Sequence, residues 1–117
     1  MARRERLICA ASELTDLGRG IRFDLTRLGK TQPAFVVRFG GIARAFLNQC
    51  GHVPVELDWQ EGEFFDDSRL YLVCATHGAL YHPASGQCVG GRCAGRGLIP
   101  VPVVERDGHV YLMEEEQ

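Results

Sequence analysis

The sequence predicts an all-β fold, and three features of the 117-residue chain support this prediction. Short apolar or alternating segments are separated by frequent turn signals, which is the pattern of strands joined by turns. Fourteen glycines and five prolines are distributed along the chain, and both residue types favour turns. Helix signals are weak, because the single turn that Ser12 would cap is ended by Gly18 and Gly20.

Apolar runs and period-two alternation place the expected strands. Two pairs of these segments flank Gly40-Gly41 and Asp107-Gly108, dipeptides typical of tight hairpins because glycine adopts positive φ without steric cost. The stretch from Gly78 to Gly97 is rich in glycine, so we expect backbone that passes close to another group and does not fold on itself. The expected strands are residues 7–10, 21–25, 34–39, 42–47, 70–73, 98–104 and 110–112.

Composition argues for an ordinary globular protein and against several classes of function. Thirteen basic residues are scattered among fifteen acidic ones, for a net charge of −2, so nucleic-acid binding is disfavoured. No apolar run reaches the roughly eighteen residues of a membrane span, and no signal core follows the basic N-terminus. We therefore expect one complete cytoplasmic domain over residues 1–117. The acidic tail 114–116 is interpreted as a solvated terminus, with docking of a basic partner as the alternative.

The chain contains five cysteines, an odd number, so they cannot all pair within one molecule. A reducing cytosol disfavours disulfides in any case, which leaves metal ligands, catalysts or small buried residues. Cys9 is expected to be a buried hydrophobe within a strand. Cys88 and Cys93 flank the most glycine-rich turn; free thiols are the favoured interpretation, and a redox-sensitive disulfide between them is the alternative.

Two short segments each carry one cysteine followed by one histidine. The first is Cys50-Gly-His52 and the second is Cys74-Ala-Thr-His77, and each follows an expected strand. A zinc finger usually takes both thiolates from one segment and both imidazoles from the other. A [2Fe–2S] centre with two cysteines on one iron and two histidines on the other fits one Cys and one His per segment. Zinc in the same site, or four ordinary core residues, are the alternatives.

The spacing Cys50-x-His52 and then Cys74-x-x-His77-Gly78 resembles the signature of the Rieske proteins. The likeness continues beyond the ligands, and it follows the small soluble Rieske-type ferredoxins that serve bacterial oxygenases. It implies a Rieske-type antiparallel β-sandwich with a small cluster-binding subdomain at about residues 50–95. The further segments that carry the likeness are residues 80–86, 90–95 and 107–110, so that residues 5–113 are covered.

The sequence departs from the family pattern at three places. The spacer between the ligand pairs is long, and the excess falls in the polar residues 61–68, where an insertion costs little entropy. The extra cysteines that brace the ligand segments of respiratory Rieske subunits are absent, since Val55 and Ala75 or Thr76 stand there. Arg92 occupies a position where many relatives have proline. The second departure favours the ferredoxin-like branch.

The resemblance implies one Rieske-type [2Fe–2S] cluster, with Cys50 and Cys74 on the buried iron and His52 and His77 on the exposed one. It also implies a soluble ferredoxin-like electron carrier that takes single electrons from a flavoprotein reductase to a terminal oxygenase. Such a chain is a component of an oxidoreductase and not an independent enzyme, with no nucleic-acid or membrane partner. Two alternatives are a fixed small subunit of a larger reductase, as in assimilatory nitrite reductases, and a redox-sensing interaction module.

Overall fold

The chain forms three antiparallel sheets, as a computed structural model describes them for residues 3–27, 29–49, 56–58, 60–75, 78–91 and 97–115. This confirms the predicted all-β fold. The elements in chain order are β1 (Arg3–Ala10), the 3-10 turn η1 (Ala11–Glu13), β2 (Ile21–Arg27), β3 (Lys30–Phe39), β4 (Ile42–Leu47), β5 (Leu72–Val73), β6 (Leu80–Tyr81), β7 (Cys88–Gly90), β8 (Pro100–Val101), β9 (Val103–Arg106) and β10 (His109–Glu115).

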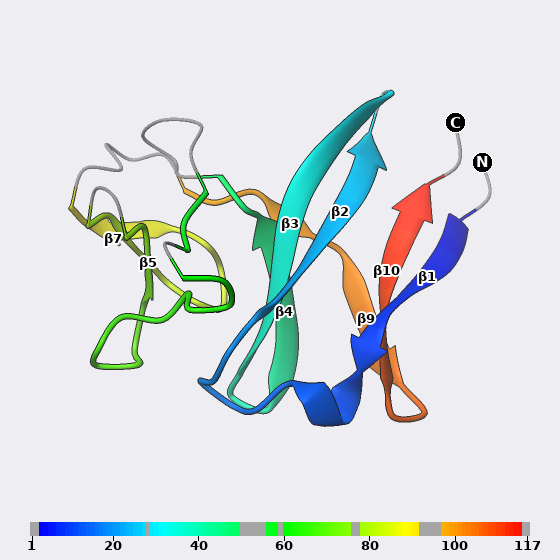
Figure 1. The fold of residues 1–117 in the computed structure, drawn as a ribbon, viewed down its shortest axis with the longest axis horizontal. Helices are drawn as coiled ribbons and strands as arrows, with labels where there is room; N and C mark the ends of the chain where they lie inside the picture. Colours follow the sequence, from blue (N-terminus) through cyan, green and yellow to red (C-terminus); the bar gives the residue numbers. More distant parts are fainter. Residues whose placement is uncertain are drawn as a thin grey trace.

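Two of the sheets form a sandwich. One has the strand order β2-β3-β4-β8 and the other β1-β10-β9, and Figure 1 shows them side by side, with the first strand paired to the last. The hairpins at both dipeptides are confirmed: Phe39 pairs with Ile42 across Gly40-Gly41, and His109 pairs with Arg106 across Asp107-Gly108. All four turn residues have positive φ, the backbone twist that a two-residue hairpin requires.

Strand β3 is buried on both faces, because the sheet that contains it is the middle layer of the molecule. Side chains alternate along a strand, so Ala34 and Val36 pack into the core of the sandwich, whereas Phe35 and Val37 pack into a second core on the opposite face. All four side chains are fully buried. In Figure 1 the sheet of β1, β9 and β10 lies on one side of β2–β4, and β5 and β7 lie on the other.

The third sheet is small and has the order β5-β6-β7. Its core joins the middle layer through Phe64, whose ring stacks on that of Phe35 with centroids 3.9 Å apart. Gly20 lies beneath this pair, where an added Cβ would come within 2.6 Å of the Phe64 ring and 2.8 Å of Val37. Glycine at position 20 thus permits the small sheet to pack closely against the middle layer. The middle layer therefore supports the small sheet.

Several predicted elements differ from the structure. The strand predicted at 70–73 shortens to β5, and the one predicted at 98–104 is divided into β8 and β9 by Pro102, which has no N–H for a sheet ladder. The glycine-rich stretch does fold on itself in part, since it contributes β6 and β7. Ser12 lies inside η1 and does not cap it; the Glu13 carboxylate instead accepts a hydrogen bond from the Ala10 N–H at 2.8 Å. Among the described residues no helix has the length and apolar character needed to cross a membrane.

Candidate metal centre

Cys74 is the one predicted ligand that lies among the described residues. It directly follows β5, is 0% exposed and packs within the second core. Cys50, His52 and His77 lie outside the described residues, although their neighbours Gln49, Glu56, Ala75 and Gly78 do not. The structure therefore shows how the ligand segments are anchored at their ends. In the described part of the chain no three His, Cys, Asp or Glu side chains gather in one place.

The second ligand segment is the tip of the β5–β6 hairpin. Leu72 pairs with Tyr81 and Val73 with Leu80. Beyond these pairs the Cys74 N–H donates to the Ala79 carbonyl at 2.9 Å, and the Gly78 N–H donates to the Cys74 carbonyl at 2.7 Å. Gly78 has a φ of +72°, which glycine adopts more readily than other residues. The backbone on both sides of the tip is thus fixed, which holds Cys74 in place.

The first ligand segment is tied to the second at its far end. Leu57, which is fully buried, accepts a hydrogen bond at its carbonyl from the Ala75 N–H at 2.9 Å. Its own N–H donates to the Asn48 side-chain oxygen at 2.8 Å. Asn48 stands at the end of β4, two positions before Cys50. The flanks of the two segments that carry the predicted ligands therefore meet at Leu57.

The third, glycine-rich segment passes directly against the second. A Cβ on Gly91 would lie 2.8 Å from the Ala79 Cα and from the Gly78 carbonyl oxygen, so only glycine allows this approach. Further along the chain, the Leu98 N–H donates to the Gly86 carbonyl at 2.7 Å. The glycines were expected to mark backbone that passes close to another group, but at Gly91 the partner is the backbone of Gly78 and Ala79 in the same glycine-rich stretch, so the stretch folds on itself here. Arg92 and Cys93 lie outside the described residues.

The other described cysteines differ in state. Cys88 is disulfide-bonded, so its favoured interpretation as a free thiol is wrong. Cys9 and Cys74 are not in disulfides. Cys9 is the predicted buried hydrophobe, at 6% exposure. Burial, followed by the charge of Glu13, raises the pKa of its thiol to about 11, so it is protonated and inert at neutral pH.

The described residues fit an iron–sulfur centre better than a solvent-exposed metal site. Cys74 supplies a thiol that is shielded from water within a fixed backbone turn, and burial suits the thiolate-bound iron of a mixed Cys/His cluster. His82 and His109 are exposed. The His82 Nδ1 accepts a hydrogen bond from the Ala84 N–H at 3.1 Å, a turn contact and not a ligand position.

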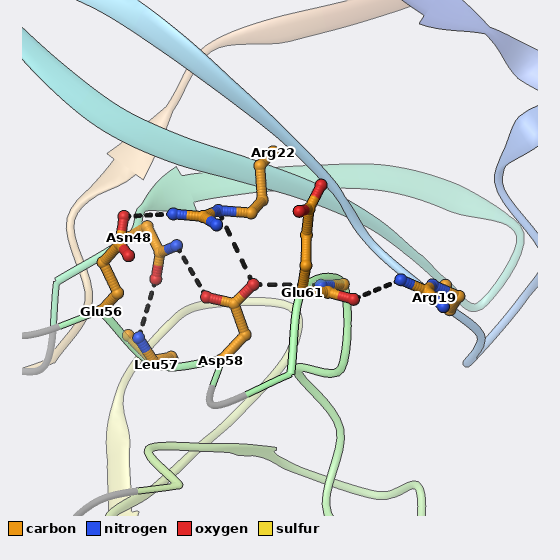
Figure 2. Close-up of polar contacts among 8 residues, drawn as sticks. Arg19, Arg22, Asn48, Glu56, Leu57, Asp58 and Glu61 are labelled. Carbon is orange, nitrogen blue, oxygen red and sulfur yellow. Dashed lines mark hydrogen bonds and ion pairs between the residues drawn. The ribbon is translucent and has the colours of Figure 1, made fainter.

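Sequence reasoning missed two polar residues at this site, Asn48 and Asp58. They are the buried polar or charged side chains of the described chain, and Figure 2 shows them joined to each other and to Leu57. A faint signal for Asn48 exists, since an amide follows the apolar run Phe46-Leu47 at the end of a strand. Asp58 gives no such signal, because several other acidic residues surround it in the sequence.

Comparison with known proteins matches this chain to the family model described as Rieske [2Fe–2S] domain, over residues 5–105. No curated protein matches the chain. Among solved structures, the Sphingomonas yanoikuyae B1 ferredoxin is similar with a TM-score of 0.69 at 19% identity, over 96% of this chain and 100% of that one. The ferredoxin of carbazole 1,9a-dioxygenase from Nocardioides aromaticivorans IC177 has a TM-score of 0.69 at 18% identity, over 92% and 95%.

A larger protein contains a similar unit. The terminal oxygenase of carbazole 1,9a-dioxygenase from Novosphingobium sp. KA1 has a TM-score of 0.69 at 22% identity, over 98% of this chain but only 30% of the oxygenase chain. At these identities the structural matches establish the fold. The match to the family model, which covers most of the chain, establishes the family.

Proposed function

Because the chain belongs to the Rieske [2Fe–2S] domain family, we propose that it is a ferredoxin-like electron carrier. The family assigns it one Rieske-type [2Fe–2S] cluster. We further propose that the ligands are Cys50 and Cys74 for one iron and His52 and His77 for the other, since this is the Cys/His division of a Rieske centre. When bound, the cluster supplies a site that gains and loses one electron, with no bond made or broken in the protein.

The observation that carries the proposal is the position of Cys74. Its thiol is fully buried at the base of the β5–β6 hairpin tip, and hydrogen bonds fix the backbone on both sides. A buried thiolate suits the iron that faces the protein, whereas imidazoles suit the iron nearer to solvent and to redox partners. Exclusion of water around Cys74 also lowers the local dielectric constant, one of the factors that set a cluster potential.

The extent of the structural matches favours a carrier over a catalytic component. The chain covers 95% or more of the two ferredoxins but 30% of the oxygenase. A complex of oxygenase and ferredoxin of carbazole 1,9a-dioxygenase includes a chain with a TM-score of 0.72 at 22% identity to this one. By analogy, we propose a terminal oxygenase as the electron acceptor and a flavoprotein reductase as the donor, each exchanging one electron per encounter.

Electron paramagnetic resonance of the dithionite-reduced protein tests the cluster and its ligands. We expect a signal whose average g value lies below that of four-cysteine [2Fe–2S] proteins, because two imidazoles replace two thiolates. A four-cysteine type of signal, or none from iron-loaded protein, would refute the proposed ligand set. Stopped-flow mixing of the reduced protein with an oxidised Rieske oxygenase then tests the role. Transfer of one electron per cluster supports a carrier, and failure to reduce any oxygenase contradicts it.

A further inference from the structure

A buried amide–carboxylate pair lies beside the first ligand segment. Asn48 is 1% exposed, and its Nδ2 donates to Asp58 Oδ1 at 3.0 Å. The Asn48 Oδ1 accepts from the Leu57 N–H at 2.8 Å. The second oxygen of Asp58 accepts from the Gly62 N–H at 3.0 Å and lies 3.7 Å from the Arg22 Nε. Figure 2 shows that these side chains converge from β2, the end of β4 and the segment after the first ligand segment.

The pair connects both ligand segments to the sandwich. Residues 50–55, which contain the two ligands proposed for the first segment, lie between Asn48 and Leu57 in the sequence. The Asn48 N–H donates to the Pro33 carbonyl of β3 at 2.9 Å, so the amide is anchored in the middle layer. Leu57 in turn accepts from the Ala75 N–H, next to Cys74. The Asn48 side chain therefore fixes the start of the first segment relative to its end. Through Leu57 it also fixes the first segment relative to the second.

We infer that Asn48 and Asp58 are positioning residues that set the separation of the two ligand segments, an inference that rests on the ligand set of the proposed function. The chemistry is specific. Asn48 must accept from one group and donate to another, which an amide does and a carboxylate does not. Asp58 must accept at both oxygens. Because both side chains are buried, a substitution that puts two donors or two acceptors opposite each other leaves a polar group without a partner. The backbone that flanks the ligands then has to shift.

The reciprocal exchange of the two side chains provides a sharp test. In N48D a carboxylate faces the Asp58 carboxylate, and in D58N two N–H donors face each other at either Asn48 or Gly62. The double variant N48D/D58N restores every hydrogen bond of the pair. The amide now at position 58 donates to the carboxylate at position 48 and still accepts from Gly62, while that carboxylate still accepts from Leu57. The three variants differ from the native protein only by exchange of NH₂ and oxygen, so that side-chain volume is nearly constant.

We expect each single variant to lose its cluster roughly 10- to 100-fold faster than the native protein, as is usual when residues that orient metal ligands are changed. Its g values and reduction potential should shift as well. Hydrogen exchange at the Leu57, Gly62 and Ala75 N–H groups should speed up roughly tenfold or more. The double variant should return all these quantities close to the native values. A variant that is only less stable would show native g values and a native reduction potential.

Glu105→Gln is the matched control. It weakens the Arg38–Glu105 ion pair, whose N–O distance is 2.9 Å, within the sandwich. It should lower stability and leave the g values and the three exchange rates unchanged. If N48D does not fold, D58N and the double variant carry the comparison.

The outcomes separate this inference from the proposed function. Native g values, potential and cluster lifetime in both single variants would overturn the positioning role while leaving the Rieske assignment intact. Absence of a Rieske signal in the native protein would refute the proposed ligand set. In that case the exchange rates at Leu57 and Ala75 still decide whether the pair couples the two segments, and unchanged rates would overturn the coupling.

Discussion

The sandwich and the small sheet are built in different ways. Strand β3 of the sandwich is ten residues long and pairs on both sides in regular ladders, whereas β5 and β6 have two residues each. The small sheet is held instead by buried side chains such as Phe64 and by single hydrogen bonds between distant segments, for example that from Ala75 to Leu57. The sandwich follows from its own local pattern, and the small sheet depends on partners far away in the sequence.

Removal of the thiol of Cys74 should produce the largest difference in behaviour between the small sheet and the sandwich. We expect Cys74→Ala to abolish the visible absorption of the cluster, since one iron loses a ligand. Metal binding contributes to the stability of the folded state, so amides in β5–β7 should exchange faster, while those of β2–β4 keep their protection. Absorption spectra and hydrogen exchange measure both effects.

Cys9→Ala is the matched control, because Cys9 is buried in the core of the sandwich. It should retain the cluster. Full retention of the cluster in Cys74→Ala would contradict the ligand assignment, and equal loss of protection in β2–β4 would contradict the independence of the two regions.

The contact between the small sheet and the sandwich, which Phe64 and Phe35 make, is where a substitution should have the next largest effect. We call this contact the joint. Phe64→Ala removes a fully buried ring that stacks on Phe35, and such truncations cost about 3–5 kcal/mol of the free energy of unfolding. Chemical denaturation followed by fluorescence gives the value. Val110→Ala is the comparison, because Val110 belongs to the core of the sandwich and not to the core that contains Phe64. We expect only Phe64→Ala to accelerate loss of the cluster; equal acceleration in both variants would show that the joint has no special role.

The two regions also differed in how far they were predictable. The hairpins at Gly40-Gly41 and Asp107-Gly108 were correctly expected, because turn chemistry and alternation are local properties. Strands β6 and β7 were missed, since two or three residues are too few to display a period. The contact of Asn48 with Asp58 spans ten positions, and the side chains meet only after the chain has folded.

The candidate site likewise has features that the sequence predicted and features that it did not. Cysteine and histidine spacing identified the ligand candidates, and the glycines indicated tight backbone packing, but they did not show that Gly91 packs against Gly78 and Ala79 of the same stretch. The sequence did not reveal that Cys88 is disulfide-bonded, because pairing depends on the distance between cysteines in space. Nor did it reveal that Phe64 joins the layers, because an aromatic residue in a polar spacer has no periodicity that assigns it to a face.

The substitution Gly20→Ala should perturb the contact between the small sheet and the sandwich less strongly than Phe64→Ala does. An alanine Cβ there would lie 2.6 Å from the Phe64 ring, and overpacking of this kind costs about 1–3 kcal/mol. Gly90→Ala is the matched control, because among the described residues its Cβ would meet only the Leu80 Cδ1 within 4 Å, at 3.8 Å. Thermal unfolding should show a lower midpoint for Gly20→Ala than for Gly90→Ala. Equal midpoints would mean that the layers can move apart at little cost.

The smallest expected effect is a decrease in the free energy of unfolding at high pH, which arises from Cys9 in the sandwich. Burial and the charge of Glu13 raise the pKa of Cys9 from 9.0 to about 11 in the folded chain. A thiol whose pKa is raised by folding favours the folded state less as pH rises, because the unfolded chain releases its proton first. The free energy of unfolding should therefore be constant below about pH 9 as far as Cys9 is concerned, and should fall between about 9 and about 11.

In Cys9→Ala this component of the fall should vanish, and urea denaturation at pH 8 and pH 10.5 compares the two proteins. A fall of the same size in both would show that Cys9 does not titrate in this range, and thus that the core of the sandwich around it is more open to water than its 6% exposure indicates.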